Sequence, residues 1–128
     1  MVAFLSEAWA DLHHERAADL PERPGASARL QYVITGSPGG EVRYHQTVVD
    51  GRVVELGLGE DPDAEVTLTQ TYADAVQIAT GALESTTAFM QGRVKVVGPM
   101  GPVMALLPLT QSDDYLGALA DVAAETDF

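Results

Sequence analysis

The feature that most constrains the fold is an alternation of apolar and polar side chains that recurs three times between residues 28 and 58. Side chains two residues apart lie on the same face of a β-strand, so each run predicts a strand with one buried face. Asp50-Gly51 separates the second and third runs, and a two-residue type I′ turn needs positive φ at both of its positions. We therefore predict a three-stranded antiparallel meander. Its predicted buried faces are Ala28, Leu30, Tyr32 and Ile34, then Val42, Tyr44 and Val48, then Val54, Leu56 and Leu58.

Helical spacing appears on both sides of the meander. Before it, Leu5, Ala8, Trp9 and Leu12 predict an amphipathic helix over residues 4–19. After it, a short fourth strand containing Val66 and Leu68 precedes a helix. Thr71 and Asp74 are spaced to cap this helix, and Gly81 is a plausible end.

The last third continues the mixed pattern. We predict a short helix over residues 84–91 and a fifth strand over 93–97. A helix then begins at Pro99 and ends before Pro108, and Ser112 caps a final helix. Residues 1–128 are therefore expected to form a single α+β domain, with one sheet whose second face is left to solvent.

The net charge and the placement of charged residues exclude some classes of function. Nineteen acidic and seven basic residues give a net charge of −12, which repels nucleic-acid phosphates, and Arg93 and Lys95 are the only basic residues after Arg52. The longest charge-free stretch, residues 96–112, is shorter than the roughly 20 residues of a membrane-spanning helix and contains three prolines. We expect no nucleic-acid partner and no stable membrane insertion. The absence of cysteine and of a basic leader favours a cytoplasmic location.

No catalytic or metal-binding constellation is apparent. His13 and His14 are adjacent on a predicted helix and point about 100° apart, so they cannot ligate one ion together, and solvent exposure is the favoured interpretation. No serine lies in a G-x-S-x-G elbow, and the glycine pairs match no nucleotide-binding motif. We therefore expect no catalytic residues, no metal and no cofactor.

The predicted helix over residues 99–108 is apolar on more than one side. Met100, Val103, Met104 and Leu107 follow helical spacing, and Leu106 adds a second apolar face. Such a helix must be covered by core, by a partner or by a ligand, and methionine suits a site that adapts to a flexible hydrocarbon. By itself, this pattern is more often ordinary core.

A family resemblance favours the ligand. The segment Thr87-Ala88-Phe89-Met90-Gln91-Gly92-Arg93-Val94-Lys95-Val96-Val97-Gly98 resembles the TAFM-x-GK-(L/V)-K-(V/I)-x-G signature of the sterol carrier protein 2 family. Upstream features agree in order, including the Asp50-Gly51 hairpin, Pro62-Asp63-Ala64 before a strand, and Leu83 after the helix that ends at Gly81. Arg93 stands where the family usually has lysine, and Pro99 where it often has an acidic residue or asparagine. The resemblance covers residues 4–119.

The resemblance implies a five-stranded mixed sheet, covered on one face by helices that enclose a hydrophobic tunnel. It implies non-catalytic binding or transfer of a fatty acid, acyl-CoA, sterol or phospholipid. The alternative is an accessory or dimerisation domain that uses the apolar groove for protein contacts. The residues predicted to contact the ligand are Ile78, Leu83, Phe89, Met90, Val94, Met100, Val103, Met104, Leu107 and Leu116.

Overall fold

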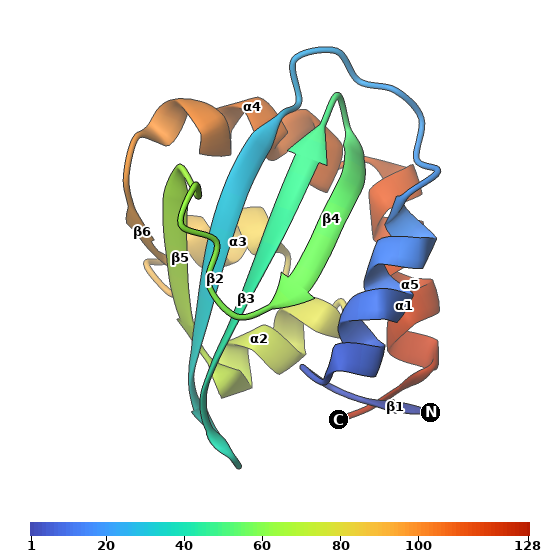
Figure 1. Cartoon of the computed structure of the whole chain (residues 1–128), viewed down its shortest axis with the longest axis vertical. Coiled ribbons are helices and arrows are strands. Elements are labelled where there is room, and N and C mark those ends of the chain that lie inside the picture. The colour runs from blue at the N-terminus through green and yellow to red at the C-terminus, as the bar shows by residue number, and fades with distance from the viewer.

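The computed structural model describes residues 1–128 and contains a five-stranded sheet in the order β4-β3-β2-β5-β6 (Figure 1). The strands are β2 (Ala28–Ser37), β3 (Gly40–Val49), β4 (Arg52–Leu58), β5 (Val66–Thr71) and β6 (Lys95–Val97). The helices are α1 (Glu7–Ala17), α2 (Tyr72–Ala79), α3 (Ser85–Met90), α4 (Met100–Thr110) and α5 (Asp113–Ala124). The predicted α+β class and the five-stranded sheet are confirmed.

The meander forms as the alternation predicts. β2 pairs antiparallel with β3, and β3 pairs antiparallel with β4. Asp50 and Gly51 have φ of 48° and 87°, the positive values that a type I′ turn requires. β5 then returns to pair with β2 in the parallel direction, and β6 closes the edge antiparallel to β5, so the sheet is mixed.

The predicted buried face of β4, formed by Val54, Leu56 and Leu58, is only partly correct. Val48 pairs with Val53 while Thr47 pairs with Glu55, so Val54 is the extra residue of a β-bulge. The bulge turns Val53 into the core, where it is 1% exposed, and leaves Val54 50% exposed. Leu56 remains buried as predicted, but Leu58 is exposed.

The helices cover one face of the sheet, as predicted. In Figure 1 the sheet lies in front of α2, α3 and α4, while α1 and α5 stand beside β4. Two predicted N-caps are present: Thr71 Oγ1 accepts from the Asp74 backbone N–H at 3.2 Å, and Ser112 Oγ accepts from that of Tyr115 at 3.2 Å. No helix is both long and apolar enough to cross a membrane.

The start of α1 differs from the prediction. The helix begins at Glu7 instead of residue 4, because Leu5 has φ of 63° and Ser6 caps the first turn by accepting from the Trp9 backbone N–H. The residues before it form β1 (Val2–Ala3), which pairs in parallel with β7 (Thr126–Asp127). These two-residue strands bring the two ends of the described chain together, a contact that no periodicity predicted.

The buried face of α1 also differs. Trp9 is buried, but Ala8 is exposed, and His13, expected in solvent, is only 6% exposed. His13 lies one turn after Trp9 on the same face of the helix, and the two rings pack edge to face with centroids 5.4 Å apart.

α4 departs from the prediction at its end and on one side. It continues through Pro108 to Thr110. Pro108 has no N–H to donate to the Met104 carbonyl, and both residues are exposed, so water can solvate that carbonyl instead. Leu106 and Leu109 are buried in the core, whereas Met104 is 54% exposed, so this chain alone covers α4 on one side only.

Candidate functional site

A cavity of about 390 Å³ lies between the helices and the covered face of the sheet. Its wall is made by 32 residues, of which 23 are hydrophobic. Small-molecule sites typically enclose roughly 300–1,000 Å³ and are lined mainly by apolar side chains. The cavity therefore has the size and chemistry of a site for an apolar small molecule.

The alternation of the strands builds the floor of the cavity. Tyr32 on β2 stands opposite Tyr44 on β3 and Leu68 on β5, and all three side chains point to the helical face. Two positions further along the ladder, Leu30 pairs with Gln46, and both side chains lie on the same face as Tyr32. β6 extends the floor through Val96, which pairs with Leu68.

The helices and the loop after α2 supply the walls. Seven of the ten predicted ligand contacts line the cavity, and the structure brings them together from α2, the segments around α3, α4 and α5. They are Ile78, Leu83, Phe89, Val94, Val103, Leu107 and Leu116. Their contact with a ligand remains a prediction, now with a definite location.

Met90, Met100 and Met104 do not line the cavity. Their exposed fractions are 79%, 40% and 54%. Met100 and Met104 are one turn apart on the outer side of α4, whereas Val103 and Leu107 are one turn apart on its inner side. These three predicted ligand contacts therefore lie outside the cavity. For Met100 and Met104 the reason is that an all-apolar helix does not reveal which side faces inward, whereas Met90 ends α3 with an exposed side chain.

An aromatic group closes the cavity near the paired β1 and β7. The Phe4 ring packs against Trp9, Tyr72 and Phe128, with centroids 5.2, 5.8 and 4.9 Å apart. Phe4, Trp9 and Phe128 all line the cavity. The short strand pair thus holds part of the cavity wall in place.

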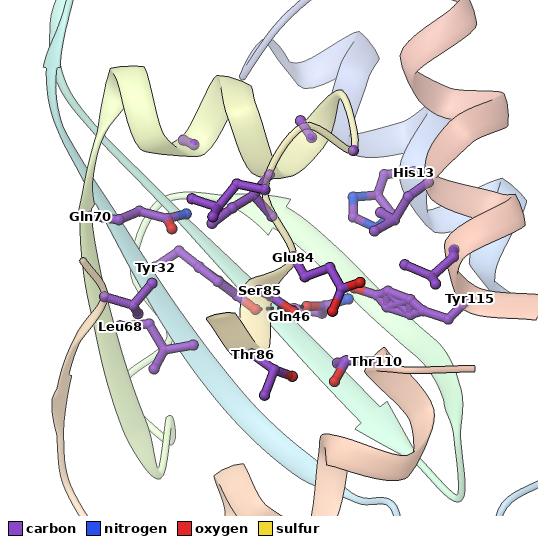
Figure 2. A pocket seen from close by; sticks show the side chains of 18 of the residues that line it. His13, Tyr32, Gln46, Leu68, Gln70, Glu84, Ser85, Thr86, Thr110 and Tyr115 are labelled. Atoms are coloured by element: carbon purple, nitrogen blue, oxygen red, sulfur yellow. Dashed lines mark hydrogen bonds between the residues drawn. The ribbon is translucent and has the colours of Figure 1, made fainter. Parts of the chain in front are cut away.

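This apolar wall also contains a group of polar side chains that was not predicted from the sequence. We call His13, Tyr32, Gln46 and Tyr115 the polar cluster; they come from α1, β2, β3 and α5. Figure 2 shows His13 and Tyr115 on one side of the cavity, with Gln46 and Tyr32 meeting at its floor. The Tyr32 hydroxyl donates to Gln46 Oε1 at 3.4 Å. Sequence signals existed: Gln46 lies between Tyr44 and Val48 on the apolar face of its strand, and His13 follows Trp9 by one helical turn.

His13 has an unusual environment for a histidine. Both ring nitrogens are buried without a hydrogen-bond partner. Desolvation, reinforced by the neighbouring His14, lowers the pKa of His13 from 6.5 to about 4. The imidazole is therefore neutral at pH 7, with one nitrogen donating and the other accepting.

The tyrosines of the cavity are also un-ionised. Burial raises the pKa of Tyr32 and of Tyr44 above the usual value for a phenol. Burial likewise raises the pKa of Tyr115, although the nearby Gln46 side chain offsets part of the increase. Glu84 is the one acidic residue in the lining, which contains neither lysine nor arginine.

Polar residues surround an exposed part of the wall. A smaller adjoining pocket shares Glu84, Ser85, Thr86, Thr110 and Leu116 with the main cavity. Gln111 Nε2 donates to Thr86 Oγ1 at 3.3 Å and so connects the end of α4 with α3. We call these residues the rim, because Glu84, Ser85 and Leu116 are exposed while lining the cavity.

The hydroxyl groups of the rim and the histidine of the cavity wall are not hydrogen-bonded to one another. No group of three His, Cys, Asp or Glu residues is placed to hold a metal ion. Ser85, Thr86 and Thr110 lie at the rim, and no hydrogen bond joins any of them to His13. Nucleophilic catalysis normally requires such contact between a hydroxyl and its base.

Comparison with known proteins gives consistent results. The family model for the SCP-2 sterol transfer family matches residues 11–111. Sterol carrier protein 2 of Gallus gallus is 31% identical over 75 residues, which are 59% of this chain and 14% of that protein. The chain thus matches only a small part of this curated relative.

Solved structures share the fold. A crystal structure of sterol carrier protein 2 has a TM-score of 0.70 and 17% identity, covering 97% of this chain and 99% of that one. The solution structure of palmitated SCP2L2 from Aedes aegypti has a TM-score of 0.62 and 16% identity, covering 84% of this chain and 92% of that one. The resemblance drawn from residues 87–98 is confirmed at the level of both the family and the fold.

Proposed function

Because this chain belongs to the SCP-2 sterol transfer family, we propose that it binds a lipid in the cavity and carries it without chemical change. The observation that carries the proposal is the cavity of about 390 Å³ with 23 hydrophobic residues among its 32 lining residues. Long-chain lipids such as fatty acids, acyl-CoA thioesters, sterols and phospholipids are the candidate class. The palmitated Aedes aegypti relative supports a ligand with a long hydrocarbon chain.

The free energy of burial is sufficient for such a role. Burying about a dozen methylenes at roughly 0.8 kcal/mol each gives on the order of 10 kcal/mol. Association costs about 4–15 kcal/mol, so the net affinity is useful but modest. A carrier needs this balance, since it must also release its ligand.

The proposed contacts are the cavity-lining residues of the helices and of β6. Val103 and Leu107 on α4, Phe89 on α3, and Val94 before β6 form part of this wall. Ile78, Leu83 and Leu116 extend this apolar wall toward the rim. The exposed methionines are not included.

Native mass spectrometry of the gently purified protein tests the proposal. We expect an added mass equal to that of a co-purified lipid, and we expect a fluorescent fatty-acid probe to be displaced by unlabelled lipid. A protein that neither retains nor exchanges any long-chain lipid, while its circular dichroism shows a folded α+β domain, would exclude the proposed role.

The alternative role in protein contacts has a separate location. Met90, Val97, Met100 and Met104 are exposed apolar side chains on or beside α3, β6 and α4, outside the cavity. A protein partner would meet these side chains instead of the cavity wall. The two roles therefore depend on different residues and can be tested separately.

A further inference from the structure

We infer that the polar cluster is a headgroup site that selects an uncharged lipid bearing a hydroxyl group over a lipid bearing a carboxylate. This inference rests on the proposed function, because it assigns a ligand class to the same cavity. It depends on where the polar atoms lie in the cavity and on which charges are absent from it.

The first observation is that His13 has unused hydrogen-bonding capacity. Its imidazole is 94% buried, since only 6% is exposed, and neither nitrogen has a partner. Figure 2 shows the ring directed into the cavity from α1. Buried polar atoms in folded proteins are nearly always hydrogen-bonded, so an unpartnered imidazole in a cavity wall indicates a missing partner.

The second observation is that a hydroxyl group has the donor and acceptor that the His13 imidazole lacks as partners. A neutral imidazole has one donor and one acceptor, and a hydroxyl group offers the complementary pair. Tyr115, on the same side of the cavity as His13 in Figure 2, has another un-ionised hydroxyl, while Gln46 already accepts from Tyr32. The two imidazole nitrogens are buried and have no protein partner, so a ligand hydroxyl can bond to them without breaking a hydrogen bond within the protein.

The third observation is the absence of a cation. No lysine or arginine lines the cavity, and Glu84 stands at its rim. Arg93, on the nearby loop before β6, is paired with Asp74 at 3.2 Å outside the cavity. A carboxylate at the polar cluster would be a buried and unpaired charge, which is strongly unfavourable.

Polar side chains occur at more than one place in the cavity wall. The polar cluster comes from α1, β2, β3 and α5, and Gln70 on β5 also points into the cavity (Figure 2). A ligand with its hydroxyl at His13 would place its hydrocarbon part against apolar lining residues such as Val94, Val96, Val103 and Leu107.

The test compares three probes of the same chain length: a long-chain 1-alcohol, the corresponding fatty acid and the corresponding alkane. Their affinities are measured by displacement of a fluorescent lipid at pH 7.5. We expect the wild-type protein to bind the alcohol about tenfold or more tightly than the fatty acid. We expect His13→Leu to weaken alcohol binding about tenfold, as the loss of one buried hydrogen bond predicts, and to leave alkane binding within about twofold.

His13→Gln is the matched variant, because it keeps a donor and an acceptor and should restore part of the alcohol affinity. Val103→Arg should instead weaken all three probes together. Equal affinity for alcohol and fatty acid in the wild type, or an equal effect of His13→Leu on alcohol and alkane, would overturn the headgroup site while leaving lipid binding intact. Failure of every probe to bind the folded wild-type protein would instead reject the proposed function.

Discussion

At the scale of single residues, the protonation of His13 is linked to the folding of the whole chain. The pKa of His13 is about 4 in the folded protein and 6.5 in an unfolded chain, so the unfolded chain takes up the proton first as the pH falls. The favourable contribution of the neutral form is complete above pH 6.5 and is lost progressively down to pH 4. The difference between the folded and unfolded pKa values of His13 corresponds to about 3 kcal/mol of the free energy of unfolding.

We therefore predict that His13→Leu removes a specific part of the acid sensitivity. Between pH 7 and pH 4 the wild-type free energy of unfolding should fall by about 3 kcal/mol more than that of the variant. The variant should also be more stable at pH 7, since it no longer buries two unpartnered nitrogens. Urea denaturation at several pH values measures both effects.

His14→Leu is the control, because His14 is adjacent in sequence but only partly buried. It should retain nearly all of the wild-type pH dependence. The His13→Leu protein contains the same carboxylates as the wild type, so the difference between their two pH profiles reports on His13. If this difference stayed constant between pH 6.5 and pH 4, burial would not be holding His13 neutral.

At the scale of secondary-structure elements, the two sides of α4 have different roles. Val103 lines the cavity, whereas Met104 is 54% exposed on the outer side. We predict that Val103→Arg weakens lipid binding by more than about tenfold, because it places a charge in the apolar wall. Met104→Arg should change the affinity by less than about twofold.

The two substitutions introduce the same side chain at adjacent positions, so each serves as the control for the other. Displacement titrations of both variants with one fluorescent lipid give the comparison, and thermal melts establish that both are folded. Weaker binding in Met104→Arg than in Val103→Arg would mean that α4 is rotated about its axis relative to the structure.

The sequence predicted most elements because their signals are local. Alternation between residues 28 and 58 and the Asp50-Gly51 turn determine the meander, and Thr71 and Ser112 cap the helices that they were predicted to cap. The bulge at Val54 was not predictable, because valine is suited to either face of a strand. The pairing of β1 with β7 was missed because two-residue strands carry no period.

The site was predictable only in part, for a similar reason. The family resemblance identified the apolar wall, but valine and methionine on α4 are equally apolar, so spacing did not reveal its inner side. The polar cluster depends on elements far apart in the chain. His13 and Tyr115 are separated by most of the sequence and line the same cavity because α1 packs against both β4 and α5.

At the scale of the whole molecule, a bound lipid should stabilise the fold. A ligand present at a hundredfold excess over its Kd raises the free energy of unfolding by about 2.7 kcal/mol. For a chain of this length, that corresponds to an increase in Tm of about 10 °C. Thermal melts with and without a long-chain alcohol measure the shift, and Val103→Arg should show little of it.

The oligomeric state tests the interaction role independently of lipid binding. If the exposed methionines have no interaction role, light scattering should give a monomer mass both with and without lipid, since the cavity wall lies inside one chain. A stable dimer that is lost in a Met90→Gln, Met104→Gln double variant would instead support an interaction role for the exposed side chains of α3 and α4.

The charge distribution makes a final prediction about lipid transfer. The net charge is −12, yet the segment from residue 85 to 112 contains no acidic residue and carries Arg93 and Lys95. Repulsion by the rest of the molecule should make transfer to vesicles of zwitterionic lipid at least about threefold faster than transfer to anionic vesicles at low ionic strength. The difference should shrink at high salt, where charges are screened within a few ångströms.

An Arg93→Gln, Lys95→Gln variant should widen the difference between the two transfer rates, because it removes the local positive charge. Faster transfer to anionic vesicles, abolished in that variant, would show that the local positive charge at the acid-free segment outweighs the net charge during membrane contact.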